Sequence, residues 1–317
     1  MQENYAVDEP GFEPKHDPVL LDECLDFLAL KKGGVAVDCT LGLGGHSVEI
    51  LKRIGPKGFL YAFDKDERNI KVAEKRLTQA AADFGAGANG AAEKNFKILH
   101  DSFSSLTDRL RREGASRVDA ILFDLGLSSP HIDDAQRGFS FKKEGPLDMR
   151  FDASGQTNAV GHGKQTAGDL LNRLPEKELA DIFWRYGEER ASRKLAREIV
   201  KVRKAQPFET TTQLTTFIEN VLGRGKPGKH RATQIFQALR IAVNEELMAL
   251  ELGLQQAVSL LAPHGRVVVL SYHSLEDRFT KHFFKQLSTD LRDPNDPFGQ
   301  RVLRAKSLSL LTKKPIT

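Results

Sequence analysis

The sequence predicts an α/β fold, a parallel sheet interrupted by an all-helical insertion, and three features of the chain lead to this prediction. Short apolar runs of strand length alternate with segments of helical periodicity from residue 35 to residue 124. The alternation stops near Ile132, and about a hundred residues follow that carry only helical patterns. A long helical segment and a fifth apolar run resume it from residue 232. We therefore expect a sheet domain in two parts, 1–131 and 232–317, with a helical insertion domain at 132–231.

The elements of the first part follow from apolar spacing and boundary residues. An Asp-Pro start and helical spacing after the polar arm of residues 1–16 predict a first helix over His16–Leu30. Residues 80–92 hold ten Ala or Gly among thirteen, so we expect a flexible surface insertion there. The expected strands are Val35–Cys39, Phe59–Phe63, Phe96–Leu99 and Asp119–Asp124, and the helices between them are His46–Ile54, Glu67–Ala82 and Phe103–Glu113.

The rest of the chain is expected to be mainly helical. Helical patterns cover Thr166–Lys204 and Thr211–Leu222, and Ala232–Leu261 is interpreted as one long helix. The apolar run Gly265–Ser271 is the expected fifth strand, and a loop over Asp293–Pro297 precedes the C-terminal stretch.

The composition excludes a disulfide scaffold and a membrane-spanning chain. There are 317 residues with a net charge of +4 and only two cysteines, Cys24 and Cys39, which we interpret as core residues in a reducing compartment. The longest aliphatic run, Val267–Leu270, is far shorter than the roughly 20 residues that a spanning helix needs. We predict a cytoplasmic protein without a membrane partner. In the insertion, Trp184 is interpreted as a core residue together with Phe183 and Tyr186.

A glycine-rich turn between the first strand and its helix is the first candidate binding site. Gly44, Gly45 and His46 stand at the expected helix N-terminus, where glycines let a ligand approach the backbone and free N–H groups face it. Asp64 ends the next strand, where a carboxylate can accept hydrogen bonds from both hydroxyls of a ribose. Together they indicate an adenosine-containing cofactor.

Details of the turn favour S-adenosylmethionine over a nicotinamide cofactor. A dinucleotide fingerprint has a third glycine three residues after the second, and this chain has Ser47 there. Asp38, at the strand end, would repel a pyrophosphate but suits the ammonium group of a methionine. A nicotinamide-dependent oxidoreductase stays open as an alternative.

A third motif, Asp124-Leu-Gly-Leu-Ser-Ser129-Pro130, follows the fourth strand. Methylation of an exocyclic amine needs a group that aligns the amine and accepts its hydrogens, which Asp124 and the turn after it can do. Tyr272 and His273 follow the fifth strand at the same sheet edge, where an aromatic ring could stack on an extruded base. No Cys/His cluster surrounds His273, so no metal site is expected.

Two clusters of basic residues without acids are expected to contact RNA phosphates. The first cluster comprises Arg224, Lys226, Lys229, Arg231 and Arg240, and the second comprises Arg301, Arg304, Lys306, Lys313 and Lys314. A non-catalytic RNA-binding factor of ribosome assembly therefore stays open as a further alternative.

Nine motifs in order make the chain resemble the small-subunit ribosomal RNA methyltransferase H (MraW) family. They are HDPVLL from His16, DCTLGLGGH from Asp38, Asp64, DLGLSSP from Asp124, RGFSF from Arg137, GPLDMR from Gly145, YGEE from Tyr186, FQALRIAVNEE from Phe236 and SYHSLEDR from Ser271. The resemblance implies a class I methyltransferase fold, a Rossmann-like doubly wound sheet with an inserted helical domain. It further implies S-adenosylmethionine as donor and the N4 amine of a cytidine in the decoding region of 16S rRNA as acceptor. We expect the RNA to be bound within the small ribosomal subunit, and we expect that the chain can form a homodimer.

The resemblance also implies roles for individual residues. Gly44, Gly45 and His46 would surround the methionine part of the cofactor, Asp64 would bind the ribose and Phe103 would stack near the adenine. Asp124 would face the reactive end of the pocket, both as the catalytic residue and as a cofactor contact, and Ser129, Pro130, Tyr272 and His273 would contact the substrate. Three departures from the family pattern are visible. His131 stands where the family often has Gln; it is expected to contact the cofactor, and an imidazole there could make this contact sensitive to pH. Arg231 stands where the family usually has Pro before Ala-Thr, and the chain reaches Thr317 without the usual basic tail.

Overall fold

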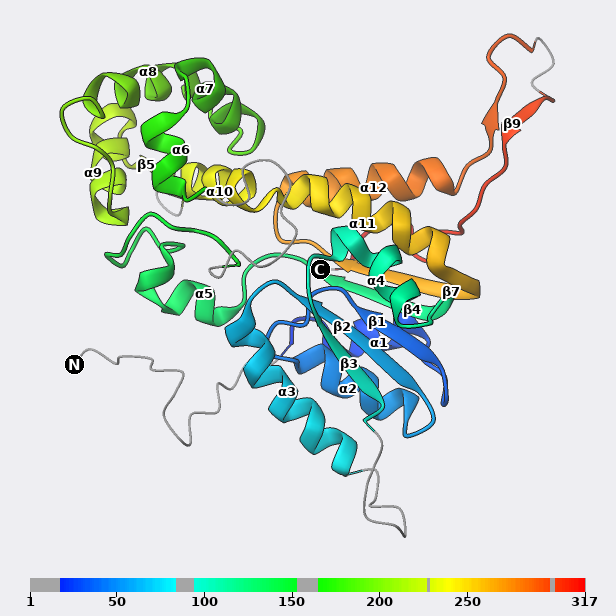
Figure 1. Cartoon of the computed structure of the whole chain (residues 1–317). Helices are drawn as coiled ribbons and strands as arrows, with labels where there is room; N and C mark the ends of the chain where they lie inside the picture. The colour runs from blue at the N-terminus through cyan, green and yellow to red at the C-terminus, as the bar shows by residue number, and fades with distance from the viewer. Residues whose placement is uncertain (1–17, 84–93, 153–164, 227–228, 297–299, 317) are drawn as a thin grey trace.

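The computed structural model describes residues 18–83, 94–152, 165–226, 229–296 and 300–316. Within these residues a parallel five-stranded sheet has the order β3-β2-β1-β4-β7. Helices cover both of its faces, and a separate group of helices lies at one end of the molecule (Figure 1). The expected α/β fold with a parallel sheet is thereby confirmed.

The strands are short and apolar because both faces of the sheet are covered. Their bounds are β1 Val35–Asp38, β2 Phe59–Asp64, β3 Phe96–His100, β4 Val118–Asp124 and β7 Leu261–Leu270. β1 lies at the centre and pairs with β2 on one side and β4 on the other. Since all five strands are parallel, Asp64 and Asp124 end their strands at the same edge of the sheet.

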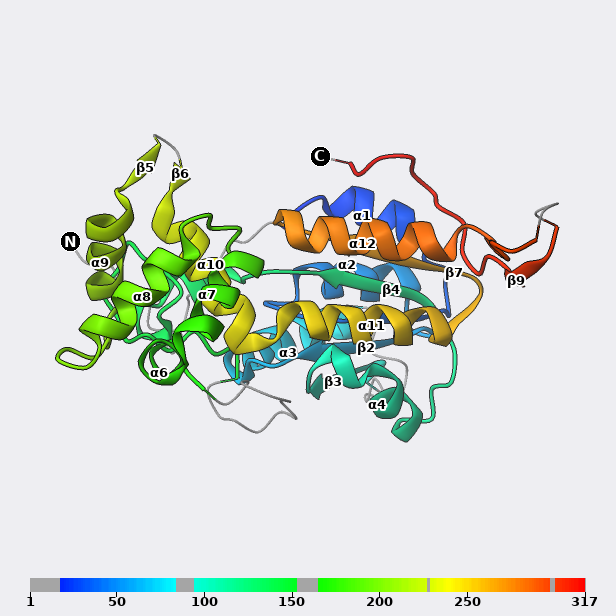
Figure 2. The same ribbon diagram turned by 90° about the horizontal axis from the view of Figure 1, so that it is seen from above.

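Each face of the sheet packs against its helices through an apolar core of its own. α1 (Leu21–Leu28), α2 (Gly45–Ile54) and α3 (Glu67–Ala82) pack on one face. The other face is covered by the 3₁₀ helix η1 (Phe103–Ser105), α4 (Leu106–Arg112), α11 (Glu246–Leu260) and α12 (Ser274–Leu287). Figure 2 shows α12 along the β7 edge and α4 at the opposite edge.

A third core holds the helical group together. It is built by α6 (Ala167–Arg173), α7 (Glu176–Arg185), α8 (Ser192–Val202), α9 (Thr211–Leu222) and α10 (Arg231–Asn244). The short α5 (Ser129–Asp133) and η2 (Ala135–Arg137) lead from β4 toward this group. α10 contributes buried residues such as Phe236 and Leu239 to this core, and α11 continues from it to the sheet. The division of the chain at residues 131 and 231 stays a prediction.

Several expected elements are confirmed, and the rest differ for physical reasons. α3 and α9 have the expected bounds, whereas α1 begins at Leu21, after Leu20 in the left-handed conformation. The expected single helix over Ala232–Leu261 is wrong: Glu245, at φ 53°, ends α10 and begins α11. The helical pattern expected over Thr166–Lys204 is confirmed and comprises three helices, α6, α7 and α8.

The sequence analysis missed α12 and two small antiparallel ribbons. The ribbons are β5 (Gly225–Lys226) with β6 (Lys229–His230), and β8 (Leu291–Arg292) with β9 (Val302–Arg304). The expected arm of residues 1–16 and most of the expected insertion of residues 80–92 lie outside the described residues, while residues 80–82 end α3.

Burial agrees with the expected core except at one aromatic residue. Phe183 is fully buried and Tyr186 packs against the helical core, but Trp184 is 56% exposed, so its assignment to the core is wrong. Trp184 follows Phe183 on α7 and therefore points about 100° away from it around the helix. Cys24 and Cys39 are both buried and free. None of the described helices is long and apolar enough to cross a membrane.

Candidate active site

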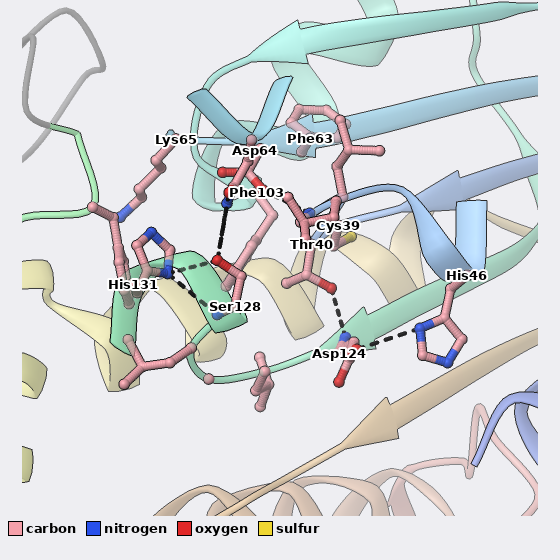
Figure 3. A pocket seen from close by; sticks show the side chains of 18 of the residues that line it. Cys39, Thr40, His46, Phe63, Asp64, Lys65, Phe103, Asp124, Ser128 and His131 are labelled. Atoms are coloured by element: carbon pink, nitrogen blue, oxygen red, sulfur yellow. Dashed lines mark hydrogen bonds and ion pairs between the residues drawn. The ribbon is translucent and has the colours of Figure 1, made fainter. Parts of the chain in front are cut away.

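A cavity of about 220 Å³ opens at the carboxyl ends of β1, β2 and β4. This is the edge at which doubly wound sheets bind their ligands. The cavity collects most of the residues predicted for the site, as Figure 3 shows for several of them. The predicted residues that line it are Gly45, His46, Asp64, Phe103, Asp124, His131 and Tyr272.

The glycine turn before α2 brings the backbone close to the cavity. Gly42 has a φ of +51°, and a Cβ built there would meet nothing nearer than 3.9 Å, so the turn leaves open space. Gly44 has a φ of +85° and does not line the cavity; a Cβ on it would lie 3.1 Å from the Cβ of Ala73 on α3. Gly45 begins α2, where a Cβ would lie 2.5 Å from Cγ of Pro18.

Asp64 lies at the end of β2 with its carboxylate held by two backbone donors. Oδ2 accepts a 2.7 Å hydrogen bond from the N–H of Gly42, and Oδ1 accepts one of 2.7 Å from the N–H of Asp66. Burial raises the pKa of Asp64 to about 7, despite the opposing effect of these hydrogen bonds. The Asn69 side chain also hydrogen-bonds this carboxylate, and because an ionised carboxylate has about four acceptor sites, it can still accept a ligand hydroxyl.

Asp124 lies between His46 and Tyr272, which come from two other elements. Its Oδ1 accepts a 2.7 Å hydrogen bond from the Tyr272 hydroxyl, and its Oδ2 lies 3.3 Å from Nδ1 of His46. Its N–H donates to Oγ1 of Thr40 at 2.6 Å, and its side chain is 25% exposed (Figure 3). The carboxylate is therefore fixed in direction while one part of it remains accessible.

His46 carries a positive charge beside Asp124. Burial lowers the pKa of its ring, but hydrogen bonds to Asp124 and Cys24 and the charge of Asp38 raise it to about 10. The surroundings match an imidazolium, because Nε2 faces the carbonyl oxygen of Val19 at 3.2 Å while Nδ1 faces Asp124. Burial first and the Asp124 hydrogen bond second raise the pKa of the Tyr272 hydroxyl, so it remains a donor.

Asp38 does not line the cavity, which corrects the expectation that it would face a methionine ammonium group. Its carboxylate is 1% exposed and accepts hydrogen bonds from Oγ of Ser47 at 2.7 Å and from the N–H of Thr40 at 3.0 Å. The serine that replaces a fingerprint glycine thus binds the strand end to α2. The carboxylate that faces the cavity beside the glycine turn is Asp124.

His131 lines the cavity as a buried, neutral ring. Nε2–H donates to Oδ2 of Asp66 at 2.9 Å, and Nδ1 accepts from the N–H of Ser128 at 3.2 Å. Burial first lowers the pKa of His131, and the charge of Arg137, which also pairs with Asp66, acts in the same direction. Because both ring nitrogens have partners, the expected pH-sensitive cofactor contact has no free nitrogen to make it.

Phe103 contributes an aromatic wall from η1. Its ring contacts Phe123 edge-on, with centroids 5.4 Å apart. Gly253 of α11 makes room for it, since a Cβ there would lie 2.7 Å from Cδ2 of the Phe103 ring. A flat apolar wall near Asp64 suits a purine base.

Comparison with known proteins identifies the family. The family model described as the MraW methylase family matches residues 13–317. The chain belongs to this family. A relative in Caldicellulosiruptor bescii named ribosomal RNA small subunit methyltransferase H is 42% identical over 303 residues, covering 96% of this chain and 92% of the relative. A relative of the same name in Dictyoglomus turgidum is 43% identical over 290 residues, covering 91% and 90%. The predicted resemblance is confirmed, and membership of a methylase family favours the methyltransferase over the oxidoreductase alternative.

In this MraW-family chain, four predicted residues do not line the cavity, and several unpredicted ones do. The four that lie outside the lining are Gly44, Ser129, Pro130 and His273. Each of them directly precedes or follows a lining residue in the chain. Lining residues that the sequence analysis did not name include Lys65, Phe151, Asn244, Glu246 and Glu276. Asn244 and Glu246 stand in the motif from Phe236, and Glu276 in the motif from Ser271, so these motifs could have pointed to them.

A group of three possible metal ligands lies beside the MraW-family cavity. Ligand atoms of Glu246, His273 and Glu276 all lie within 4.8 Å of one another. Arg240 already pairs with both oxygens of Glu246, through Nε and Nη2 at 2.8 Å each. A guanidinium in this position opposes a second cation, and the expectation of no metal stays a prediction.

The basic clusters expected to bind RNA are only partly available. Arg240 is wrongly placed among them, because its side chain is 13% exposed and pairs with Glu246. Arg231 pairs with Glu189 at 2.8 Å, whereas Arg224 is 81% exposed, 3.3 Å from Glu219. In the second cluster, Arg304 ends β9 and Arg301 directly precedes it, at the end of the molecule opposite β5 and β6; the chain that follows β9 returns over α12 (Figure 2).

Proposed function

We propose that this chain transfers a methyl group from S-adenosylmethionine to the N4 amine of a cytidine in the decoding region of 16S rRNA. Membership of the MraW methylase family supports the reaction class, and the relatives' name, ribosomal RNA small subunit methyltransferase H, supports the substrate. One observation carries the proposal: the accessible carboxylate of Asp124 shares a cavity with the glycine turn and with Asp64.

The cavity residues fit S-adenosylmethionine. Asp64 would accept the ribose hydroxyls, the Phe103 ring would lie near the adenine, and Gly45 and His46 would surround the methionine part. Open space at Gly42 leaves the turn accessible to it. When bound, the cofactor supplies a methyl group on a sulfonium sulfur. His131 would contribute its ring surface only, since both nitrogens are engaged.

The chain's own residues would hold the acceptor amine in line. The lone pair of a cytosine amine is delocalised into the ring, so the site needs to orient it and to accept its N–H hydrogens. Asp124 would accept one of these hydrogens, with His46 and Thr40 fixing its direction. Tyr272, 52% exposed, would stack on the extruded base. Ser129 and Pro130 would contact the nucleotide where α5 begins.

The assembly context belongs to the same proposal. RNA phosphates would bind Arg224 at one end of the molecule and Arg301 and Arg304 at the other, in a salt-dependent way. An assembled small ribosomal subunit as the form of the substrate, a homodimer and a cytoplasmic location stay predictions.

Methyl transfer to ribosomal subunits tests the proposal. The protein is incubated with methyl-labelled S-adenosylmethionine and small subunits that lack the modification, and nucleosides are identified by mass spectrometry. We expect labelled N4-methylcytidine with the wild type and none with Asp124→Ala. Asp108→Ala, which removes an exposed carboxylate on α4, is the matched control and should leave the product unchanged. Label in another nucleoside, or full activity of Asp124→Ala, would contradict the proposal.

A further inference from the structure

Tyr272 is held in place by contacts at its ring, its hydroxyl and its main chain. Its hydroxyl donates to Oδ1 of Asp124 at 2.7 Å. Its ring lies against the backbone of Gly126, where φ is +107° and a Cβ would come within 3.2 Å of Cδ2 of the ring. Its N–H donates to Oε2 of Glu276 at 2.9 Å. Glu276, which holds the main chain of Tyr272, has no role in the proposed reaction as described above.

Glu276 is a buried carboxylate in the first turn of α12. Its side chain is 3% exposed, and it lines the cavity. The N–H of Glu276 donates to Nδ1 of His273 at 3.4 Å, so side chain and main chain bond reciprocally around the start of α12. Exposed residues can form a helix cap of this kind. Burying the Glu276 carboxylate costs desolvation energy that capping alone does not require, which indicates a role beyond capping.

Glu276 lies close to charged side chains at the junction of α10 and α11. Nε2 of His273 is buried without a hydrogen-bond partner and lies 3.1 Å from Oε1 of Glu276. Glu246, paired bidentately with Arg240, has a carboxylate oxygen within 4.8 Å of ligand atoms of His273 and Glu276. The Arg240 guanidinium, on α10, also interacts electrostatically with Glu276, so the start of α12 lies close to the end of the helical core.

We propose that Glu276 is a positioning residue for methyl transfer, which acts by holding the main chain of Tyr272 so that the Tyr272 ring stays beside Asp124, where the substrate base would stack. This inference rests on the proposed function. In the free protein the Tyr272 hydroxyl occupies Oδ1 of Asp124, the carboxylate that the substrate amine would need. With the main chain fixed by Glu276, the amine replaces the hydroxyl by rotation of one side chain, and the ring stays beside the base. Without Glu276 the whole loop can move, and the amine loses its alignment.

Kinetics of two substitutions at Glu276 test the proposal. Glu276→Ala should lower kcat about 10- to 100-fold, because a misplacement of about 1 Å in the reacting groups has a cost of that order. Glu276→Gln retains an oxygen that can accept from the N–H of Tyr272 and should remain within about threefold of the wild type, by the same reasoning. The affinity for S-adenosylhomocysteine should be unchanged in both. Thr280→Ala, at a buried position one turn further along α12, is the control for helix packing.

A double-mutant cycle separates positioning from a general loss of structure. If Glu276 acts through Tyr272, Glu276→Ala should have little further effect on kcat in a Tyr272→Ala background. The proposal would be overturned if the losses in kcat of Glu276→Ala and Tyr272→Ala multiply in the double variant. It would also be overturned if the kcat of Glu276→Gln is as low as that of Glu276→Ala.

A spectroscopic titration tests the same inference without any substrate. The ultraviolet difference between each protein and its Tyr272→Phe counterpart reports ionisation of Tyr272 alone. Its pKa is raised first by burial, then by the hydrogen bond and charge of Asp124, and to a smaller extent by the charge of Glu276. Both variants lack that last charge, so the pKa should fall further toward the ordinary tyrosine value in Glu276→Ala, where the hydroxyl also leaves Asp124, than in Glu276→Gln. An unchanged titration in Glu276→Ala would refute the inference even if the wild type methylates rRNA. A wild type that transfers no methyl group while the titration shifts as expected would instead refute the proposed function.

Discussion

The affinity of the protein for S-adenosylhomocysteine should depend on pH through Asp64. Burial raises the pKa of this carboxyl to about 7, so its charge changes near neutrality. The ionised form of the carboxyl accepts hydrogen bonds at more sites than the protonated form, so it is the form that would accept a ribose hydroxyl. Affinity should therefore rise with pH up to about 7 and then level off.

The size of the effect follows from the position of this pKa. With a value of about 7, roughly one molecule in thirty is ionised at pH 5.5. If only the ionised form binds well, Kd at pH 5.5 should be about 30-fold weaker than at pH 8, or about 2 kcal/mol at about 1.4 kcal/mol per pH unit. Linkage requires the same ligand to lower the pKa of Asp64 when it binds.

Calorimetric titration between pH 5.5 and 8 measures this dependence. His46, whose pKa is raised to about 10, stays charged over the whole range and does not contribute to it. Asp64→Asn is the matched variant and should bind weakly with no dependence on pH. A wild-type affinity that is flat across the range, or a slope that survives in Asp64→Asn, would refute the assignment of Asp64 to the ribose.

Two further predictions concern packing around the site and in the helical core. Gly253→Ala places a methyl group 2.7 Å from the Phe103 ring, so the ring must shift. We expect calorimetry to show about tenfold weaker binding of S-adenosylhomocysteine. The control Gln255→Ala, on the exposed side of α11, should leave binding unchanged. Phe183→Ala removes a fully buried ring and should lower the free energy of unfolding by about 3–5 kcal/mol in denaturant titrations, whereas Trp184→Ala, at a 56% exposed position, should cost about 1 kcal/mol or less. Equal costs for the two would contradict the burial described here.

The sequence by itself determined the order of strands and helices and the edge at which the site forms. Apolar runs of four to seven residues between helical patterns identify β1 to β4, because buried parallel strands are apolar on both faces. Parallel strands end at one edge, so Asp64, Asp124 and the glycine turn had to lie near one another. These predictions depend only on local patterns and on the geometry of a parallel sheet.

Only the tertiary structure decided which side chains meet. Tyr272 and Asp124 are 148 residues apart, and their contact depends on the packing of β7 beside β4. The break at Glu245 directly follows Asn244, whose side chain hydrogen-bonds the distant main chain of Met149 and Phe151. Even over nine residues, the Asp38 carboxylate binds the Ser47 hydroxyl and does not line the cavity, which the strand pattern did not indicate. Periodicity gives the face of an element that is buried, whereas the partner of each polar group is set by contacts between segments far apart in the chain.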